Sequence, residues 1–147
     1  MQIRSITPDT IDAAVLQGAA WAEQYDQPYD IESWRASVRN YAVYFDHYAR
    51  LIQDNIGQHR GIVLGAVRQL PHTGERLGQL HYLYLDPAVQ ELDNLVSILQ
   101  DFGNYLEPFG TDRIEIECFT RLPQWYSDCL TELGYTADRR TVRKGSA

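Results

Sequence analysis

Apolar residues in the first third of the chain repeat at the spacing of an amphipathic helix. They recur every three or four positions over residues 11–25, and again from residue 30 or 31 to residue 45. Residues at that spacing share one face of a helix. Pro28 separates the two segments, because proline lacks the backbone donor that a continuing helix needs. The pattern predicts a short strand over residues 2–6 followed by two helices.

The spacing changes to two after His47, which is typical of strands. Alternating residues predict strands over 48–53, 62–69 and 78–85, and Gly57 and Gly74 lie in the turns between them. These three strands are expected to form an antiparallel meander that ends at Asp86 and Pro87.

The second half alternates helices with strands. The pattern predicts a helix over 92–106, a strand over 113–119, a helix from Pro123 to Gly134 and closing strands over 136–144. A helix that joins strand 78–85 to strand 113–119 makes a right-handed parallel crossover. The 147 residues are therefore predicted to form a single α/β domain, with the order β-α-α-β-β-β-α-β-α-β and a mixed central sheet flanked by helices.

The net charge of −7 is unevenly distributed. The basic tail, residues 139–147, carries four positive charges and no negative one, so residues 1–138 carry −11. Such an acidic surface repels nucleic acid and anionic membranes, and the tail is either solvated or in contact with a phosphate or an acidic neighbour. No run approaches the roughly 20 apolar residues of a membrane span, and the first ten residues lack the apolar core of a signal peptide. We expect a cytoplasmic protein.

Few residues follow a pattern of known chemistry. The four histidines have no ligand spacing, so no metal is expected, and Cys118 and Cys129 are expected to be buried thiols. Glu115 and Glu117 share one face of their predicted strand, and His81 lies on the neighbouring strand. Glu117 and His81 could therefore form an acid/base pair with a raised pKa. The alternative is surface carboxylates beside a histidine whose hydrogen bonds are satisfied.

Aromatic residues are concentrated in the first half. A stripe at helical spacing, which predicts a core-facing surface, consists of Trp34, Val38, Tyr41, Phe45 and Tyr48. Exposed aromatic residues would instead suit an interface with a protein partner, because aromatic side chains dominate the energetics of interfaces. The candidates for such an interface are Trp21, Tyr25, Tyr29 and Trp34.

Two short motifs lie between residues 80 and 135. The first runs from Tyr84 through Leu85 and Asp86 to Pro87 and is followed by Gln90, and the second is Leu133, Gly134 and Tyr135. Their order and spacing resemble the GNAT (general N-acetyltransferase) superfamily. The resemblance implies that acetyl-CoA would lie where strands 80–85 and 113–119 splay apart. The residues that would contact it are Leu85, Gln90, Leu92, Asp93, Asn94 and Leu95.

The chain departs from the family pattern at positions that serve the cofactor. In the pattern Q/R-x-x-G-x-G/A, Gln90 matches, but Asp93 and Leu95 stand where the glycines belong. A carboxylate about 4 Å from a phosphate is repelled by roughly 4 kcal/mol at an effective dielectric near 20, which is about a thousandfold in affinity. Leu95 adds bulk where the backbone must approach the cofactor closely. Leu130 replaces the tyrosine that can protonate the departing thiolate, and Tyr126 lies one turn earlier.

Two functions fit this sequence. The one we favour is a non-catalytic binding or assembly module without a cofactor, phage-encoded or accessory by analogy with compact members of the fold, that binds a protein partner or itself. The alternative is an N-acetyltransferase that uses acetyl-CoA and a small-molecule or protein amine, with Glu117 or His81 assisting. Free backbone N–H groups near residues 90–94, beside an open gap between strands 80–85 and 113–119, would favour the enzyme. A gap filled by Tyr82, Tyr84 or Phe119 would favour the module.

Overall fold

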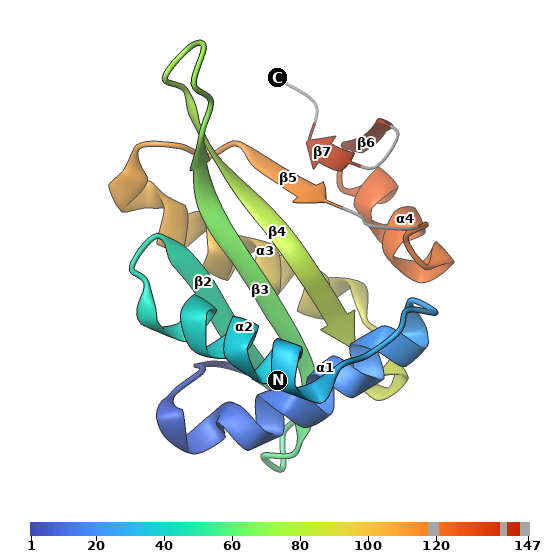
Figure 1. Ribbon diagram of the computed structural model, residues 1–147. Coiled ribbons are helices and arrows are strands. Elements are labelled where there is room, and N and C mark those ends of the chain that lie inside the picture. Colours follow the sequence, from blue (N-terminus) through green and yellow to red (C-terminus); the bar gives the residue numbers. More distant parts are fainter. Residues whose placement is uncertain (118–120, 139–140, 145–147) are drawn as a thin grey trace.

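The computed structural model describes residues 1–117, 121–138 and 141–144, and within these ranges the strands form one mixed sheet with helices on both faces (Figure 1). The seven strands have the order β1-β2-β3-β4-β5-β7-β6. The elements are β1 (Gln2–Ser5), α1 (Ile11–Gln24), α2 (Ile31–Val43), β2 (His47–Gln53), β3 (His59–Gln69), β4 (Arg76–Leu85), α3 (Leu92–Leu106), β5 (Ile114–Glu117), α4 (Gln124–Glu132), β6 (Tyr135–Asp138) and β7 (Thr141–Lys144). Short 3₁₀ turns precede α1 (η1, Pro8–Thr10), precede α3 (η2, Pro87–Val89) and follow α3 (η3, Glu107–Phe109).

The connections explain why the sheet is mixed. Strands β1 to β4 form an antiparallel meander, and α3 then carries the chain back so that β5 pairs parallel to β4. Strand β7 lies antiparallel between β5 and β6. The predicted α/β fold with a mixed sheet is confirmed, including the parallel crossover through residues 92–106.

The two faces of the sheet bury separate cores, because successive strand residues point to opposite sides. On one face, α1 and α2 cover a cluster that includes Trp21, Trp34 and Tyr84. On the other face, α3 and α4 contribute Phe102 and Tyr126 to a cluster that lies against Leu85 and its neighbours. Figure 1 shows α1 and α2 in front of the sheet and α3 behind it.

Helix α2 is shorter than predicted, and the aromatic stripe divides between the two faces. The helix ends at Val43, because Tyr44 adopts an extended conformation with φ −80° and ψ 134°. Phe45 therefore lies in the turn and is 82% exposed rather than in the core. Tyr48 is buried, but it lies on β2 and belongs to the cluster under α3. The prediction holds for Trp34, Val38 and Tyr41 and is wrong for Phe45.

Two further predictions concern a membrane span and the two cysteines. Among the described residues, no helix has the length and apolar character needed to span a bilayer. Cys129 is a buried free thiol, and burial raises its pKa. Cys118 lies outside the described residues, as does most of the basic tail.

Candidate functional site

The place expected for the cofactor lies beside the second half of β4. Among the described residues, β4 and β5 pair over residues 78–80 and 114–116, and β4 continues to Leu85. Strand β4 has a bulge toward the start of this half, because Gly65 pairs with Leu80 and Leu64 pairs with Tyr82, which leaves His81 as the extra residue. As a result His81 and Tyr82 both contact the helices on the α1/α2 face: His81 meets Tyr41, and Tyr82 meets Trp21 and Trp34.

The backbone of β4 beyond the bulge is hydrogen-bonded by side chains of the same chain. The Tyr25 hydroxyl donates to the Leu83 carbonyl at 2.7 Å. The Leu85 N–H donates to the Tyr126 hydroxyl at 2.9 Å. The Leu85 carbonyl accepts from Gln90 at 3.0 Å and from Gln24 at 3.2 Å. Three polar groups that an extended ligand could use along this edge, the Leu83 carbonyl and the N–H and carbonyl of Leu85, are therefore already hydrogen-bonded.

Tyr126 occupies the centre of this arrangement. Its side chain is fully buried, and its ring lies 6.1 Å from the Tyr25 ring in a stacked geometry. Its hydroxyl accepts from the Leu85 N–H and donates to the Gln24 side-chain oxygen at 2.5 Å. Burial raises the pKa of Tyr126, so the hydroxyl stays protonated at neutral pH. Tyr25 and Tyr126, and not the residues expected from the sequence, lie against this edge of β4, and a hollow of about 520 Å³ lies beside Tyr25, between the end of α1 and residues 121–124. Tyr82 and Tyr84 face α1 and α2, and Phe119 lies outside the described residues.

The start of α3 differs from the expectation at Leu95. This side chain is fully buried in the core with Ile98 and Phe102, because it lies on the inward face of an amphipathic helix. Its bulk is therefore directed into the core, and the expectation that it blocks the helix end is wrong. Asp93 is exposed in the first turn, and Leu92 packs partly against the core.

The other predicted cofactor residues are held by their own chain. The Asn94 side chain donates to the Val89 carbonyl at 2.9 Å, and Gln90 folds back onto Leu85. The backbone N–H groups of Asn94 and Leu95 both donate to the Glu91 carbonyl. These contacts order the loop between β4 and α3. Among the described residues, the backbone N–H groups of Leu92 and Asp93 have no hydrogen-bond partner, which is the feature expected to favour the enzyme.

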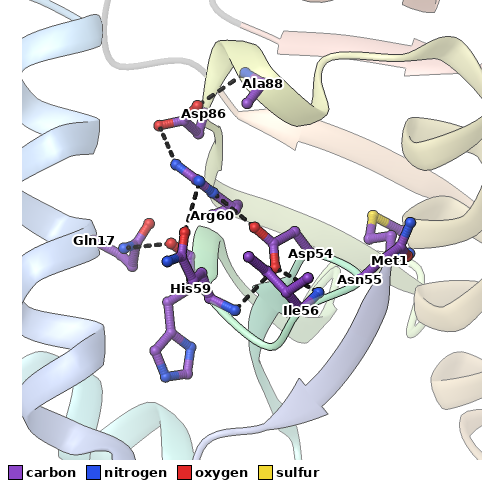
Figure 2. A network of polar contacts seen from close by, with 10 residues as sticks. Met1, Gln17, Asp54, Asn55, Ile56, His59, Arg60, Asp86 and Ala88 are labelled. Carbon is purple, nitrogen blue, oxygen red and sulfur yellow. Dashed lines mark hydrogen bonds and ion pairs between the residues drawn. The ribbon is translucent and has the colours of Figure 1, made fainter.

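Arg60 fixes the turn at which this loop begins. Figure 2 shows its guanidinium between Asp54, at 3.0 Å, and Asp86, at 3.9 Å. Asp86 also accepts from the backbone N–H of Ala88 at 2.8 Å. The turn between β2 and β3 is thereby tied to the end of β4. The same view shows Gln17 of α1 beside His59, whose carbonyl it contacts at 3.4 Å.

The fold brings the predicted acid/base pair together. His81 Nε2 lies 3.9 Å from Glu117 Oε2 and 3.3 Å from Gln79 Oε1. Both oxygens can only accept, so the proton belongs on Nε2, and Nδ1 accepts from the Tyr41 hydroxyl at 2.5 Å. The Nδ1 lone pair, which His81 would need in order to act as a general base, is therefore occupied by the hydrogen bond from Tyr41. Sequence reasoning assigned Tyr41 to the core only, since no local signal marks its contact with His81.

Burial lowers the pKa of His81, and the nearby Glu117 offsets only part of this effect. The expectation of a raised pKa is wrong for this residue. The unfolded chain, with a histidine pKa near 6.5, binds more protons than the folded chain as the pH falls below that value. The contribution of neutral His81 to stability is thus present above about pH 6.5 and is lost on acidification.

We expect His81→Gln to reduce the acid sensitivity of folding. Urea denaturation at about pH 7.5 and about pH 5.5 should show a larger loss of stability for the wild type than for the variant. His72→Gln, in an exposed turn, is the matched control and should behave like the wild type. The same pH dependence in all three proteins would contradict the assignment.

Two of the four candidate interface aromatics are buried. Trp21 and Trp34 are 8% and 7% exposed, because they stack on each other at 5.9 Å between the helices and the sheet. Tyr25 and Tyr29 are half-buried, and the Tyr29 hydroxyl donates to the Val15 carbonyl at 2.7 Å. The expectation that Trp21 and Trp34 are exposed is wrong.

A hollow of about 360 Å³ lies over this aromatic cluster. Its lining includes Trp21, Tyr29, Asp30, Ser33, Trp34 and Tyr82. Across the described ranges, no group of three or more histidine, cysteine or acidic residues is placed to hold a metal ion.

Comparison with known proteins identifies the architecture. No protein-family model and no curated protein sequence matches the chain. Among solved structures, an aminoglycoside antibiotic 6'-N-acetyltransferase from Acinetobacter baumannii superposes with a TM-score of 0.76 at 12% identity, covering 99% of this chain and 97% of that chain. A predicted acetyltransferase with acetyl-CoA from Clostridium acetobutylicum gives 0.76 at 11%, covering 94% and 91%. A ribosomal-protein-alanine N-acetyltransferase from Brucella melitensis gives 0.72 at 14%, covering 94% of each chain. This protein therefore has the GNAT fold.

Proposed function

We propose that this protein is a GNAT-fold binding module that does not transfer acetyl groups. The observation that carries the proposal is the occupied edge of β4. Tyr25 bonds to the Leu83 carbonyl, and Gln24 and Tyr126 bond to the carbonyl and the N–H of Leu85, all from within the folded chain. The module would act by binding a protein partner or a second copy of itself, without a cofactor.

The energy needed to reopen the gap supports this reading. An extended cofactor arm that used the Leu85 N–H would have to displace the buried Tyr126, whose hydroxyl accepts from that group. Exposing an aromatic side chain of roughly 200 Å² costs about 5 kcal/mol at about 25 cal/mol per Å², which lowers affinity by more than about a thousandfold. Asp93, exposed in the first turn of α3, adds repulsion toward a pyrophosphate.

Two observations favour the alternative, an acetyl-CoA-dependent N-acetyltransferase acting on an amine. His81 and Glu117 lie close together, and the aromatic hollow is on the α1/α2 side, where helices would wall an acceptor site. The hydrogen bond from Tyr41 to His81 argues against an available base.

Titration with acetyl-CoA tests the proposal. We expect no heat and no thermal stabilisation up to about 1 mM cofactor, whereas a Kd of about 10 µM would stabilise the fold by about 2.7 kcal/mol at that concentration. Micromolar binding by the wild type would overturn the proposal.

A double variant tests whether the gap itself is the barrier. Tyr25→Ala combined with Asp93→Gly removes one ring from the gap and the repelling carboxylate. We expect at least about a tenfold gain in acetyl-CoA affinity, equivalent to about 1.4 kcal/mol. Binding by neither protein would show that other features exclude the cofactor.

A further inference from the structure

The outward face of α2 carries an unusual stripe of side chains. Ile31, Arg35, Arg39 and Val43 follow one another at four-residue steps, so they lie along one side of the helix. Ile31 is 49% exposed and Val43 is 77% exposed. Like charges at this spacing destabilise a helix by a few tenths of a kcal/mol. Two exposed apolar residues flanking an arginine pair are therefore unfavourable for the isolated domain.

Only one of the two arginines is neutralised. Arg35 forms an ion pair with Asp12 of α1 at 2.6 Å. Arg39 is exposed, and within the part of the chain that the structure describes it makes no ion pair or hydrogen bond. Arg39 thus presents an uncompensated positive charge on a chain whose net charge is −7.

A groove of about 720 Å³ runs beside this stripe, between η1 with the start of α1 and the end of α2. Its apolar lining comes from Ile6, Pro8, Ile11, Ala42 and Val43, and its charged rim from Asp12, Arg35 and Arg39. The volume lies in the usual range for binding pockets, roughly 300–1,000 Å³. Beyond Val43 the exposed apolar surface continues through Tyr44 and Phe45, which are 57% and 82% exposed.

We propose that this groove, with the outer face of α2, docks an acidic amphipathic helix of a partner protein. The apolar side of that helix would fill the groove and cover Val43, and a carboxylate would face Arg39. The stripe from Ile31 to Val43 is about 18 Å long, which matches about three helical turns. A small ligand in the groove would leave Tyr44 and Phe45 exposed.

The charges beside the groove, and not the net charge of the chain, determine the sign of the charge expected on the partner helix. At physiological salt the overall charge of −7 is screened beyond about 8 Å. A docked helix therefore responds mainly to the charges at the rim, where Arg35 is paired with Asp12 and Arg39 is the uncompensated charge. This inference rests on the proposed function, because it names a partner for the binding module. The proposed function and the docking proposal would fail in different experiments. Acetyl-CoA titration tests the site beside β4, and peptide binding tests the groove.

The test uses three fluorescent helical peptides of about twelve residues, the span of the stripe. All three have the same leucine face, and their polar faces carry glutamate, glutamine or lysine. We expect anisotropy titrations with the full chain to show at least about tenfold tighter binding of the glutamate peptide than of the other two. Arg39→Glu should weaken binding of the glutamate peptide about tenfold or more without changing the thermal midpoint, since Arg39 is exposed.

Arg121→Glu, in the loop before α4, is the matched control and should leave the affinity unchanged. Equal binding of all three peptides, or an equal loss in the two arginine variants, would overturn the proposal. Concentration-dependent dimerisation that Arg39→Glu abolishes, without binding of the glutamate peptide, would also overturn it and would assign the groove to a second copy of the chain.

Discussion

Replacing Tyr126 by alanine is expected to lower the free energy of unfolding by about 3–5 kcal/mol, the range for removing a large aromatic side chain from a core. The side chain is fully buried in the cluster that contains Leu85 and Leu130. Its removal would leave a cavity and would deprive the Leu85 N–H of its acceptor. Chemical denaturation of both proteins measures the difference, and the slope with denaturant shows whether unfolding remains cooperative.

Two further variants separate the ring from the hydroxyl. Tyr126→Phe keeps the ring but leaves the Leu85 N–H without an acceptor, and it should cost about 1–3 kcal/mol. Tyr44→Ala makes the same change as Tyr126→Ala at a residue that is 57% exposed, and it should shift stability by no more than about 0.5 kcal/mol. A loss below about 1 kcal/mol in Tyr126→Ala would mean that the ring does not fill the gap beside β4.

Gly18→Ala is expected to destabilise the fold by about 1–3 kcal/mol, although alanine is the better helix former. A methyl group at this position of α1 would overlap the Trp34 indole. Moving the indole would break its N–H donation to the Ala14 carbonyl, now at 3.1 Å, and its packing on Trp21. Overpacking costs about 1–3 kcal/mol and sometimes more, the lost hydrogen bond about 1 kcal/mol, and the helix propensity of alanine returns about 1 kcal/mol.

Gly103→Ala in α3 is the matched control, because a methyl group there meets no atom within 4 Å. It should stabilise the protein by about 0.5–1 kcal/mol. Thermal and denaturant unfolding of the two variants should therefore differ in sign. If Gly18→Ala also stabilised the protein, the contact between α1 and α2 would have to be looser than the packing of Trp34 indicates.

The Gly18–Trp34 contact and the Tyr126 site are linked through helix α1. The close contact of Gly18 with Trp34 places α1 against α2, and the same helix presents Gln24 and Tyr25 to the edge of β4. Tyr25 and Tyr126, which bond to this edge of β4, therefore pack in or against the core.

The elements of the fold were largely predictable because their signals are local. The apolar face of residues 92–106 and the alternation of residues 78–85 both repeat within a few residues, and both elements form as expected. Alternation also placed Glu115 and Glu117 on one face, where the structure has them beside Gln79 and His81. The end of α2 was predicted two residues too late, since a tyrosine and a phenylalanine continue the helical pattern into the turn.

The site depended on contacts that no local pattern encodes. Tyr126 bonds to Gln24 across 102 residues and Tyr25 bonds to Leu83 across 58 residues. The bulge that turns His81 toward Tyr41 arises from strand pairing. The sequence alone determined which segments are helices and strands and which faces are apolar. The tertiary structure alone decided that Leu95 points into the core and that two tyrosines close the edge of β4, because side-chain direction and hydrogen-bond partners depend on how distant elements pack together.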